Sequence, residues 1–180
     1  MHFIQASEKT QLDQIEALYE KSFPKSEKKP FSLICEKQAA GMVDILYIQE
    51  NNDFCGLAIT MKNNDLVLLD YFAIAPEKHG VGCGSAALQQ LFRYYEEKRF
   101  FLEIETTKEE ADNMIQRQRR KRFYLKNDMT ELGIDVVVFG TNMELLGHNI
   151  SLTPEEYLNV YQDTYGQNIA KNVQISTFLI

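Results

Sequence analysis

The hydrophobic and polar positions of this chain change period several times, and these changes predict its helices and strands. Apolar residues that recur every three or four positions predict helices. Short runs rich in β-branched and aromatic residues predict strands, and clusters of Asn, Asp, Gly and Pro predict turns. Helices are expected over 8–22, 31–40, a segment ending near 95, 109–126 and from 153 onward. Strands are expected over 2–6, 43–48, 54–61, 66–75, 100–106, 130–138, 142–147 and 173–180.

This order of elements predicts an α+β fold in which a mixed sheet is flanked by helices. Turn residues at 50–53 and 62–65 join three antiparallel strands. With 180 residues, 44% of them hydrophobic, the chain is long enough to bury a core of its own. We expect a single domain over residues 1–180, with a core of about 1–149 and a C-terminal helix–strand extension of about 150–180.

The most informative stretch is residues 66–88, where a strand, a glycine-rich turn and a helix follow one another. The apolar strand stops at Pro76, and Gly80, Gly82 and Gly84 alternate through the turn. Glycine lets the backbone adopt positive φ and approach a ligand closely. The first turn of a helix also offers N–H groups that have no partner within the helix. The stretch therefore predicts a binding site for a phosphate or pyrophosphate.

Two common phosphate motifs fit this stretch less well. The Walker-type loop, Gly-x-x-x-x-Gly-Lys-Ser/Thr, is absent. The relaxed dinucleotide pattern is present as Gly82-x-Gly84-x-x-Ala87, and Glu103 follows about twenty residues on, where a ribose-binding acid belongs. However, six residues separate the strand from Gly82, whereas a dinucleotide-binding turn begins almost directly after its strand. The chain beyond the turn is also too short for a doubly wound sheet.

A third pattern accounts for more residues. His79-Gly80-Val81-Gly82-Cys83-Gly84 resembles the Gln/Arg-x-x-Gly-x-Gly/Ala signature of the GNAT superfamily of acetyl-CoA-dependent N-acetyltransferases, and Ile74-Ala75-Pro76 is similar to the strand end before it. Residues 122–129, Arg-Phe-Tyr-Leu-Lys-Asn-Asp-Met, resemble the family's second signature, Tyr-x-Lys/Arg-x-Gly-Phe. The resemblance covers roughly residues 66–139. His79 replaces the usual Arg or Gln, and Asp128-Met129 replaces the usual Gly-Phe.

The resemblance implies a coenzyme A site with acetyl-CoA as co-substrate, a small-molecule or peptide amine as acceptor, and no metal. Backbone groups at the strand end would bind the pantetheine arm and polarise the thioester carbonyl; these belong to Phe72, Ala73 and Ile74. The turn and the helix start would bind the pyrophosphate through His79, Gly80, Val81, Gly82, Cys83, Gly84 and Ser85. A module of the same fold that binds acyl-CoA without turnover is the alternative.

Acetyl transfer to an amine also needs an acid for the departing thiolate and a base for the amine. Tyr124 matches the tyrosine of the second signature and is the candidate acid, because an unperturbed phenol with a pKa of about 10 stays protonated at neutral pH. Glu103 is the candidate base. It shares one face of its strand with Glu105, and some family members place a base there. Asp70 and Tyr71 on the preceding strand, and a base acting through water, stay open as alternatives.

Composition narrows the partners and the location. The net charge of −7 argues against nucleic acid and is compatible with a cationic acceptor such as an amine. No segment approaches about twenty apolar residues, so no membrane span is expected, and residues 1–10 lack the pattern of a signal peptide. The three cysteines, Cys35, Cys55 and Cys83, have no CxxC spacing. This spacing argues against a zinc site or a disulfide framework and favours a reducing cytoplasm.

Three further patterns have simpler structural explanations. Cys83 at a helix start is a conceivable nucleophile, but we interpret it as a variable position of the glycine turn. The basic residues of 117–122 complement the macrodipole of a helix that would open with Glu109 and Glu110; contact with the 3′-phosphate of coenzyme A is the alternative.

Residues 173–180 predict an apolar strand. Because a free apolar edge favours pairing, we expect a homodimer in which this strand takes part, with an intramolecular strand in a monomer as the alternative.

Overall fold

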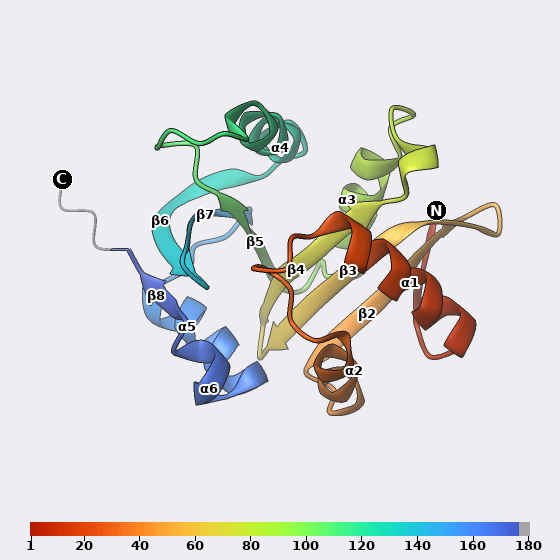
Figure 1. The fold of residues 1–180 in the computed structure, drawn as a ribbon, viewed down its shortest axis with the longest axis horizontal. Helices are drawn as coiled ribbons and strands as arrows, with labels where there is room; N and C mark the ends of the chain where they lie inside the picture. Colours follow the sequence, from red (N-terminus) through yellow and green to blue (C-terminus); the bar gives the residue numbers. More distant parts are fainter. Residues whose placement is uncertain (177–180) are drawn as a thin grey trace. The chain divides into compact units, whose positions relative to one another are not determined.

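The computed structural model describes residues 1–176 of the chain. Its eight strands form one mixed sheet flanked by helices, which confirms the predicted α+β class. The elements follow in the order drawn in Figure 1: β1 (His2–Gln5), α1 (Lys9–Ser22), α2 (Phe31–Ala39), β2 (Val43–Glu50), β3 (Asp53–Asn63), β4 (Leu66–Ile74), the 3-10 turn η1 (Pro76–Lys78), α3 (Cys83–Tyr94), β5 (Arg99–Glu105), α4 (Met114–Lys126), β6 (Thr130–Val138), β7 (Thr141–His148), α5 (Pro154–Tyr165), α6 (Gln167–Ala170) and β8 (Val173–Ile175).

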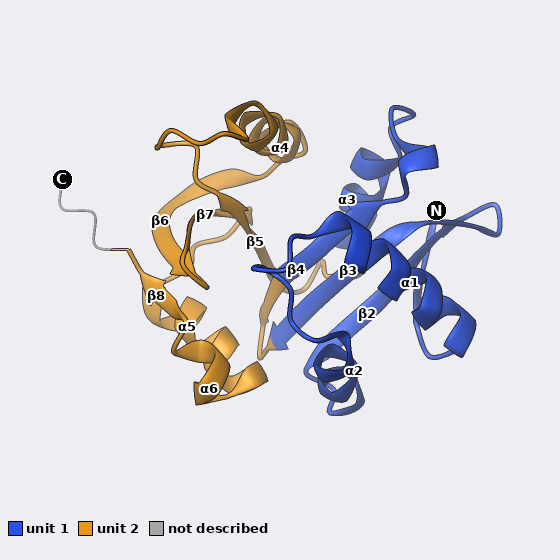
Figure 2. Cartoon of the chain, in the orientation of Figure 1, with its two compact units in different colours: residues 1–62, 69–94 blue, residues 63–68, 95–180 orange. Residues whose placement is uncertain are grey.

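The chain divides into two compact units, coloured blue and orange in Figure 2. Unit 1 comprises residues 1–62 and 69–94, and unit 2 comprises residues 63–68 and 95–180. Unit 1 contains the strand order β1-β2-β3-β4, and unit 2 contains β5-β7-β6-β8. β4 is shared, because its first three residues belong to unit 2. The expectation of a single domain over residues 1–180 stays a prediction.

Unit 1 is built on antiparallel pairs β1–β2 and β2–β3. Asn51 and Asn52, both at positive φ, form the turn between β2 and β3, and two such residues give a turn whose twist matches that of the strands. The helices bury one side each, as their spacing predicts. The buried residues are Ile15, Leu18 and Tyr19 in α1, and Cys83, Ala87, Leu88, Leu91 and Phe92 in α3.

Unit 2 is built around β7, which pairs antiparallel with β5 and with β6. Its helix α5 begins with a reciprocal cap: Glu156 N donates to Thr153 Oγ1, and Thr153 N donates to the Glu156 carboxylate. The cap satisfies two N–H groups that a helix start otherwise leaves unpaired. Arg99, at the start of β5, forms ion pairs with both Asp65 and Glu156. This network connects the first turn of α5 to the sheet.

One helix begins later than the sequence predicts. The pattern indicated a helix over 109–126, whereas α4 begins at Met114. Asn113 precedes it, donating its side-chain amide to Glu105 Oε1 and accepting from Arg117 Nε. These contacts hold Asn113 at the helix start. Glu109 and Glu110 therefore lie outside the first turn, so the predicted match between those acids and the macrodipole of this helix was wrong.

The basic residues of α4 are used in ion pairs instead. Arg117 and Arg120 both contact the carboxylate of Glu105 on β5. Lys121 forms ion pairs with Glu131 and with the buried Glu144. These contacts connect α4 to the sheet of unit 2. Three of the basic residues of 117–122 are therefore ion-paired within the chain.

The C-terminal strand pairs within its own chain. β8 is antiparallel to β6, with Val173 opposite Val138 and Ile175 opposite Val136. The rest of the predicted strand, residues 177–180, lies outside the described residues. The homodimer stays a prediction. Over residues 1–176, no helix is long and apolar enough to cross a bilayer.

Candidate cofactor loop and acid–base residues

The predicted anion site is the turn between β4 and α3 in unit 1. Gly80 and Gly82 have φ values of 80° and 81°, in the region that a β-carbon disfavours. A Cβ built on either glycine would meet nothing within 4 Å, so this backbone faces open space. The first hydrogen bond of α3 runs from Ala86 N to Gly82 O. The N–H groups before Ala86 in the first turn therefore have no acceptor within the helix, and the turn fits an anion.

The strand end before this turn packs closely against β3. A Cβ on Gly56 would come within 2.3 Å of Ala73 O, so a side chain cannot be placed there without moving β4. Ala75 N donates to Cys55 O over 2.8 Å. The three residues of the predicted pantetheine contact, Phe72, Ala73 and Ile74, are half-buried. Close packing holds their backbone groups in place, which a binding site made of backbone requires.

His79 bonds back to its own strand. Its Nε2 lies 2.7 Å from Ile74 O, and its backbone N–H donates to Pro76 O. With a proton on Nε2, the imidazole donates to the Ile74 carbonyl. The side chain that replaces the family's Arg or Gln therefore connects the turn to β4. The anion contacts of the turn would then come from backbone N–H groups.

Cys83 opens α3, and its thiol is buried. Burial, followed by the neighbouring Cys55 and Glu50, raises the pKa of the Cys83 thiol to about 11. This direction is opposite to that of an activated nucleophile, whose thiol pKa is lowered. The structure thus favours the interpretation of Cys83 as a non-nucleophilic residue of the turn.

Tyr124 lies on α4 in unit 2, and only 8% of its surface is exposed. Burial raises the pKa of its hydroxyl to about 12, against a lowering effect of Arg120. Among residues 1–176, no group hydrogen-bonds to this hydroxyl, although the Tyr124 carbonyl accepts from Asn127 N and Met129 N. The hydroxyl oxygen itself is not among the fully buried, unpaired side-chain atoms of the described residues, so it keeps some contact with solvent. A protonated donor held without a partner fits the role of an acid toward a bound ligand.

Asp128 and Met129, which replace the usual Gly-Phe of the second signature, are compatible with the backbone and the packing at these positions. Asp128 has a φ of 65°, which explains why glycine suits this position and why aspartate, one of the more tolerant residues, can replace it. Its carbonyl accepts from His148 Nδ1. Met129, in place of the usual phenylalanine, is 2% exposed. It therefore fills a core position as a phenylalanine would.

Glu103 lies on β5, half-buried, under two tyrosines of α5. Tyr157 donates its hydroxyl to Glu103 Oε1 over 2.6 Å, and Tyr161 donates to both carboxylate oxygens at 3.0 Å. Hydrogen bonds to a charged acceptor are the stronger kind, so the carboxylate is held in one orientation. Neither tyrosine was among the site residues predicted from the sequence. Their spacing of four on a helix was a signal that they share a face, but only the fold shows that this face meets Glu103.

The other acids on these strands are already paired. Although burial opposes it, a hydrogen bond from Asn113 and the charges of Arg120 and Arg117 lower the pKa of Glu105. Asp70 receives Lys29 Nζ on both oxygens at 2.9 Å, and the two side chains are 5% and 3% exposed. Burial raises the pKa of Asp70, while Lys29 opposes the rise. A base must reach its substrate, so this closed pair makes Asp70 a poorer candidate than Glu103.

The segment between β5 and α4 forms a depression of about 590 Å³ within unit 2. It is lined by Thr107, Lys108, Glu109, Glu110, Ala111, Asp112, Met114 and Gln118. Lys108 is ion-paired with Asp135, so acids predominate around the opening. A negatively charged surface attracts cations rather than anions.

The structure thus places the predicted cofactor residues in one continuous segment of unit 1, from the end of β4 to the start of α3. The predicted acid and base lie on α4 and β5 of unit 2. The model of the acetyltransferase (GNAT) family matches residues 12–119, more than half of the chain, and the chain belongs to this family.

Solved structures with the same fold have low sequence identity to this chain. A protein from Bacteroides thetaiotaomicron assigned to the GNAT family superposes with a TM-score of 0.78 at 19% identity, over 93% of this chain and 99% of its own. The ribosomal-protein-S18-alanine N-acetyltransferase of Escherichia coli gives 0.62 at 17%, over 86% and 96%. An aminoglycoside 6′-N-acetyltransferase in complex with coenzyme A gives 0.65 at 12%, over 86% and 99%. A search of curated proteins found no significant match.

Proposed function

We propose that this protein is an N-acetyltransferase that moves an acetyl group from acetyl-CoA to a primary amine by direct transfer. The observation that carries the proposal is the turn between β4 and α3, where Gly80 and Gly82 hold positive φ and face open space. Acceptors of different kinds occur among structures of the same fold: one acts on a ribosomal protein and another on an aminoglycoside. The acceptor here is a small-molecule or peptide amine, without nucleic acid or a membrane as partner, and the site of action is the cytoplasm.

The cofactor would be held mainly by backbone. Phe72, Ala73 and Ile74 would offer strand-end groups to the pantetheine arm. The turn from His79 to Ser85 would offer the N–H groups at the start of α3 to the pyrophosphate. Since the His79 imidazole already contacts Ile74 O, its role is to position the turn. Acetyl transfer from a thioester requires no metal ion.

Tyr124 would give its proton to the departing thiolate. Its side chain is buried, its hydroxyl has no hydrogen-bond partner among residues 1–176, and its raised pKa of about 12 keeps it protonated at neutral pH. Glu103 would take the proton of the amine, directly or through water, with Tyr157 and Tyr161 holding its carboxylate in place. The amine then attacks the thioester carbonyl, the C–S bond breaks, and the thiolate leaves as a thiol.

A binding module without turnover is the second candidate, and one observation favours it. Glu103 accepts hydrogen bonds from two tyrosines, as a purely structural carboxylate would. The decisive experiment measures thiol release from acetyl-CoA with a panel of polyamines, aminoglycosides, amino acids and peptide N-termini. Amine-dependent release that Tyr124→Phe abolishes, with coenzyme A binding kept, supports the enzyme. Tight coenzyme A binding without release for any amine supports the module.

A further inference from the structure

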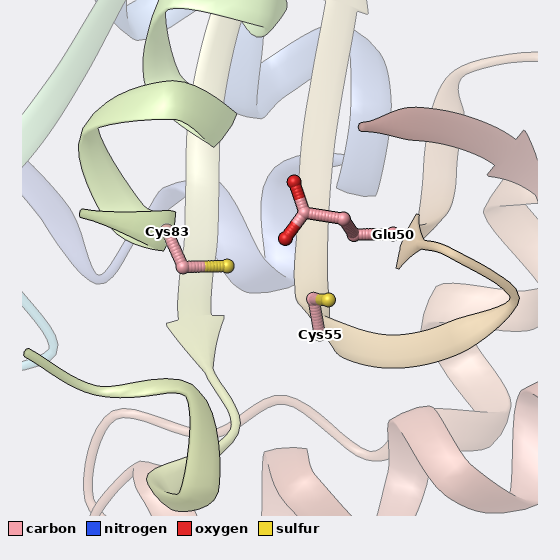
Figure 3. A group of neighbouring side chains, drawn as sticks. All are labelled: Glu50, Cys55 and Cys83. Carbon is pink, nitrogen blue, oxygen red and sulfur yellow. The ribbon is translucent and has the colours of Figure 1, made fainter. Parts of the chain in front are cut away.

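Three side chains with metal-binding atoms meet in unit 1, beside the start of α3. Figure 3 shows the carboxylate of Glu50, from the end of β2, together with the sulfur atoms of Cys55 on β3 and Cys83 on α3. One ligand atom from each lies within 4.8 Å of the others. Cys55 and Cys83 are 0% and 5% exposed, and Glu50 is more accessible. The cysteine spacing gave no sign of this cluster, because its members come from three different elements.

The fold holds these groups together independently of any ligand. Glu50 and Cys55 flank the tight hairpin turn between β2 and β3, next to a register shift after Ile48. Cys55 Sγ lies 3.5 Å from Asp53 O. Cys83 is the first residue of α3, directly after Gly82. The positions of all three are therefore set by the hairpin and by the helix start.

Lys78, the lysine nearest to Cys83 in the sequence, is ion-paired elsewhere, because its Nζ lies 3.1 Å from the carboxylate of Asp53. A bound divalent ion would balance the charge of the Glu50 carboxylate and stabilise the two thiolates, displacing their protons.

We propose that Glu50, Cys55 and Cys83 form a binding site for a thiophilic divalent cation, with Zn²⁺ as the best match. Two thiolates and a carboxylate are ligands that zinc accepts, and three protein ligands leave a fourth position for water. Zinc bonds of about 2.3 Å to sulfur and about 2.1 Å to oxygen place tetrahedral ligands about 3.5–3.8 Å apart. Side-chain shifts of about 1 Å bring the present atoms to that spacing.

The site is independent of the acetyl-transfer chemistry and supplies no step to it. Its effect would be structural, since one ion would join β2, β3 and α3 next to the glycine turn. Failure of the metal site would leave the proposed acetyltransferase untouched, and the reverse also holds. The two proposals therefore need separate measurements.

The test uses the full chain, stripped of metal by a chelator and kept reduced with a phosphine. Co²⁺ titration of the wild type should produce sulfur-to-cobalt charge-transfer absorption and the strong visible bands of a tetrahedral site, at one ion per chain, and Zn²⁺ should abolish both. Cys55→Ser, Cys83→Ser and Glu50→Gln should each weaken Co²⁺ binding by at least about tenfold. Cys35→Ser is the matched control, because Cys35 lies on α2 outside the cluster. It should bind as the wild type does.

A second readout protects against variants that do not fold. Zn²⁺ should raise the melting temperature of the wild type and of Cys35→Ser by several degrees, as a ligand of the native state does. The rise should be absent in Glu50→Gln, the substitution at the most accessible of the three positions. A wild type with no charge-transfer absorption and no zinc-dependent shift overturns the proposal. Equal cobalt spectra in the wild type and in all three cluster variants overturn it as well.

Discussion

The glycine turn of unit 1 and the proposed acid–base residues of unit 2 differ in which part of the polypeptide would act. In the turn, the proposed ligand contacts are backbone N–H groups, and the lack of a β-carbon on Gly80 and Gly82 leaves open space beside them. In unit 2, the proposed groups are the side chains of Tyr124 and Glu103, each held by its surroundings.

This difference has a consequence for mutation. A site made of backbone tolerates side-chain exchange but not an added Cβ, whereas a site made of side chains loses its function when one atom is removed. Changes in unit 1 should therefore alter coenzyme A affinity, and changes in unit 2 should alter the chemical step.

The largest effect is expected from Tyr124→Phe. If the hydroxyl acts only as the thiolate leaves, kcat should fall by about 10²–10⁴-fold, with little change in KM. Coenzyme A affinity, measured by calorimetry, should stay within about twofold of the wild type. Because burial raises the pKa of Tyr124 to about 12, the acid stays protonated below that value. No decline in kcat from its ionisation should therefore appear up to about pH 10.

Tyr47→Phe is the control for this variant. It removes a hydroxyl that bonds to Gln14 in unit 1 and should leave kcat unchanged. A loss below about threefold in Tyr124→Phe, with chemistry shown to be rate-limiting, would make Tyr124 a packing residue.

Glu103→Gln should lower kcat/KM by about 10²-fold near neutral pH, where the amine is protonated and needs a base. The amide oxygen can still accept hydrogen bonds from Tyr157 and Tyr161, so folding should be kept. Rates of variant and wild type should converge at high pH, because the free amine then predominates. A loss of kcat/KM that is the same at every pH would show that Glu103 only positions its neighbours. Glu109→Gln serves as the control, because Glu109 is a half-exposed carboxylate in the same unit.

Gly82→Val should weaken coenzyme A binding by at least about tenfold, since it adds a branched side chain where the pyrophosphate would approach. Gly41→Val is a matched control: Gly41 has a φ of 77° and, like Gly82, open space at its Cβ position, but it follows α2. Both variants should lose about 1–2 kcal/mol of stability from the backbone conformation. Only Gly82→Val should lose coenzyme A affinity, as calorimetry would show; unchanged affinity would remove the main support for the cofactor site.

The smallest effect is expected at Asp128, where the second signature departs from the family. Asp128→Val should lower the free energy of unfolding by about 1–2 kcal/mol, because a β-branched residue tolerates a φ of 65° poorly. Asp128→Gly should change it by less than about 0.5 kcal/mol, since relief of strain is offset by greater freedom of the unfolded chain. Urea unfolding measures both. Equal stability of the two variants would mean that the left-handed conformation does not limit this position.

Local sequence signals predicted most of the fold. Alternating apolar residues and turn residues placed the strands to within a few positions, as at β6, predicted and observed over 130–138. The start of α4 was misplaced because Glu109 and Glu110 look like good first-turn residues. The contacts of Asn113 with Glu105 and Arg117, which set the true start, join segments that a local pattern does not connect. The 3-10 turn η1 and the short helix α6 were also not anticipated.

The sequence by itself determined the glycine turn that we propose as the cofactor site, because glycine spacing reflects a backbone requirement directly: positive φ is adopted most readily by a residue without a Cβ. It also indicated Tyr124 and Glu103 as candidates. Only the tertiary structure decided their surroundings: the burial that raises the pKa of Tyr124, the two tyrosines that hold Glu103, and the pairing of Asp70 with Lys29. The tertiary structure alone also brings Cys55, Cys83 and Glu50 together. Such contacts join residues distant in sequence, and no local period encodes which of them the folded chain brings within bonding distance.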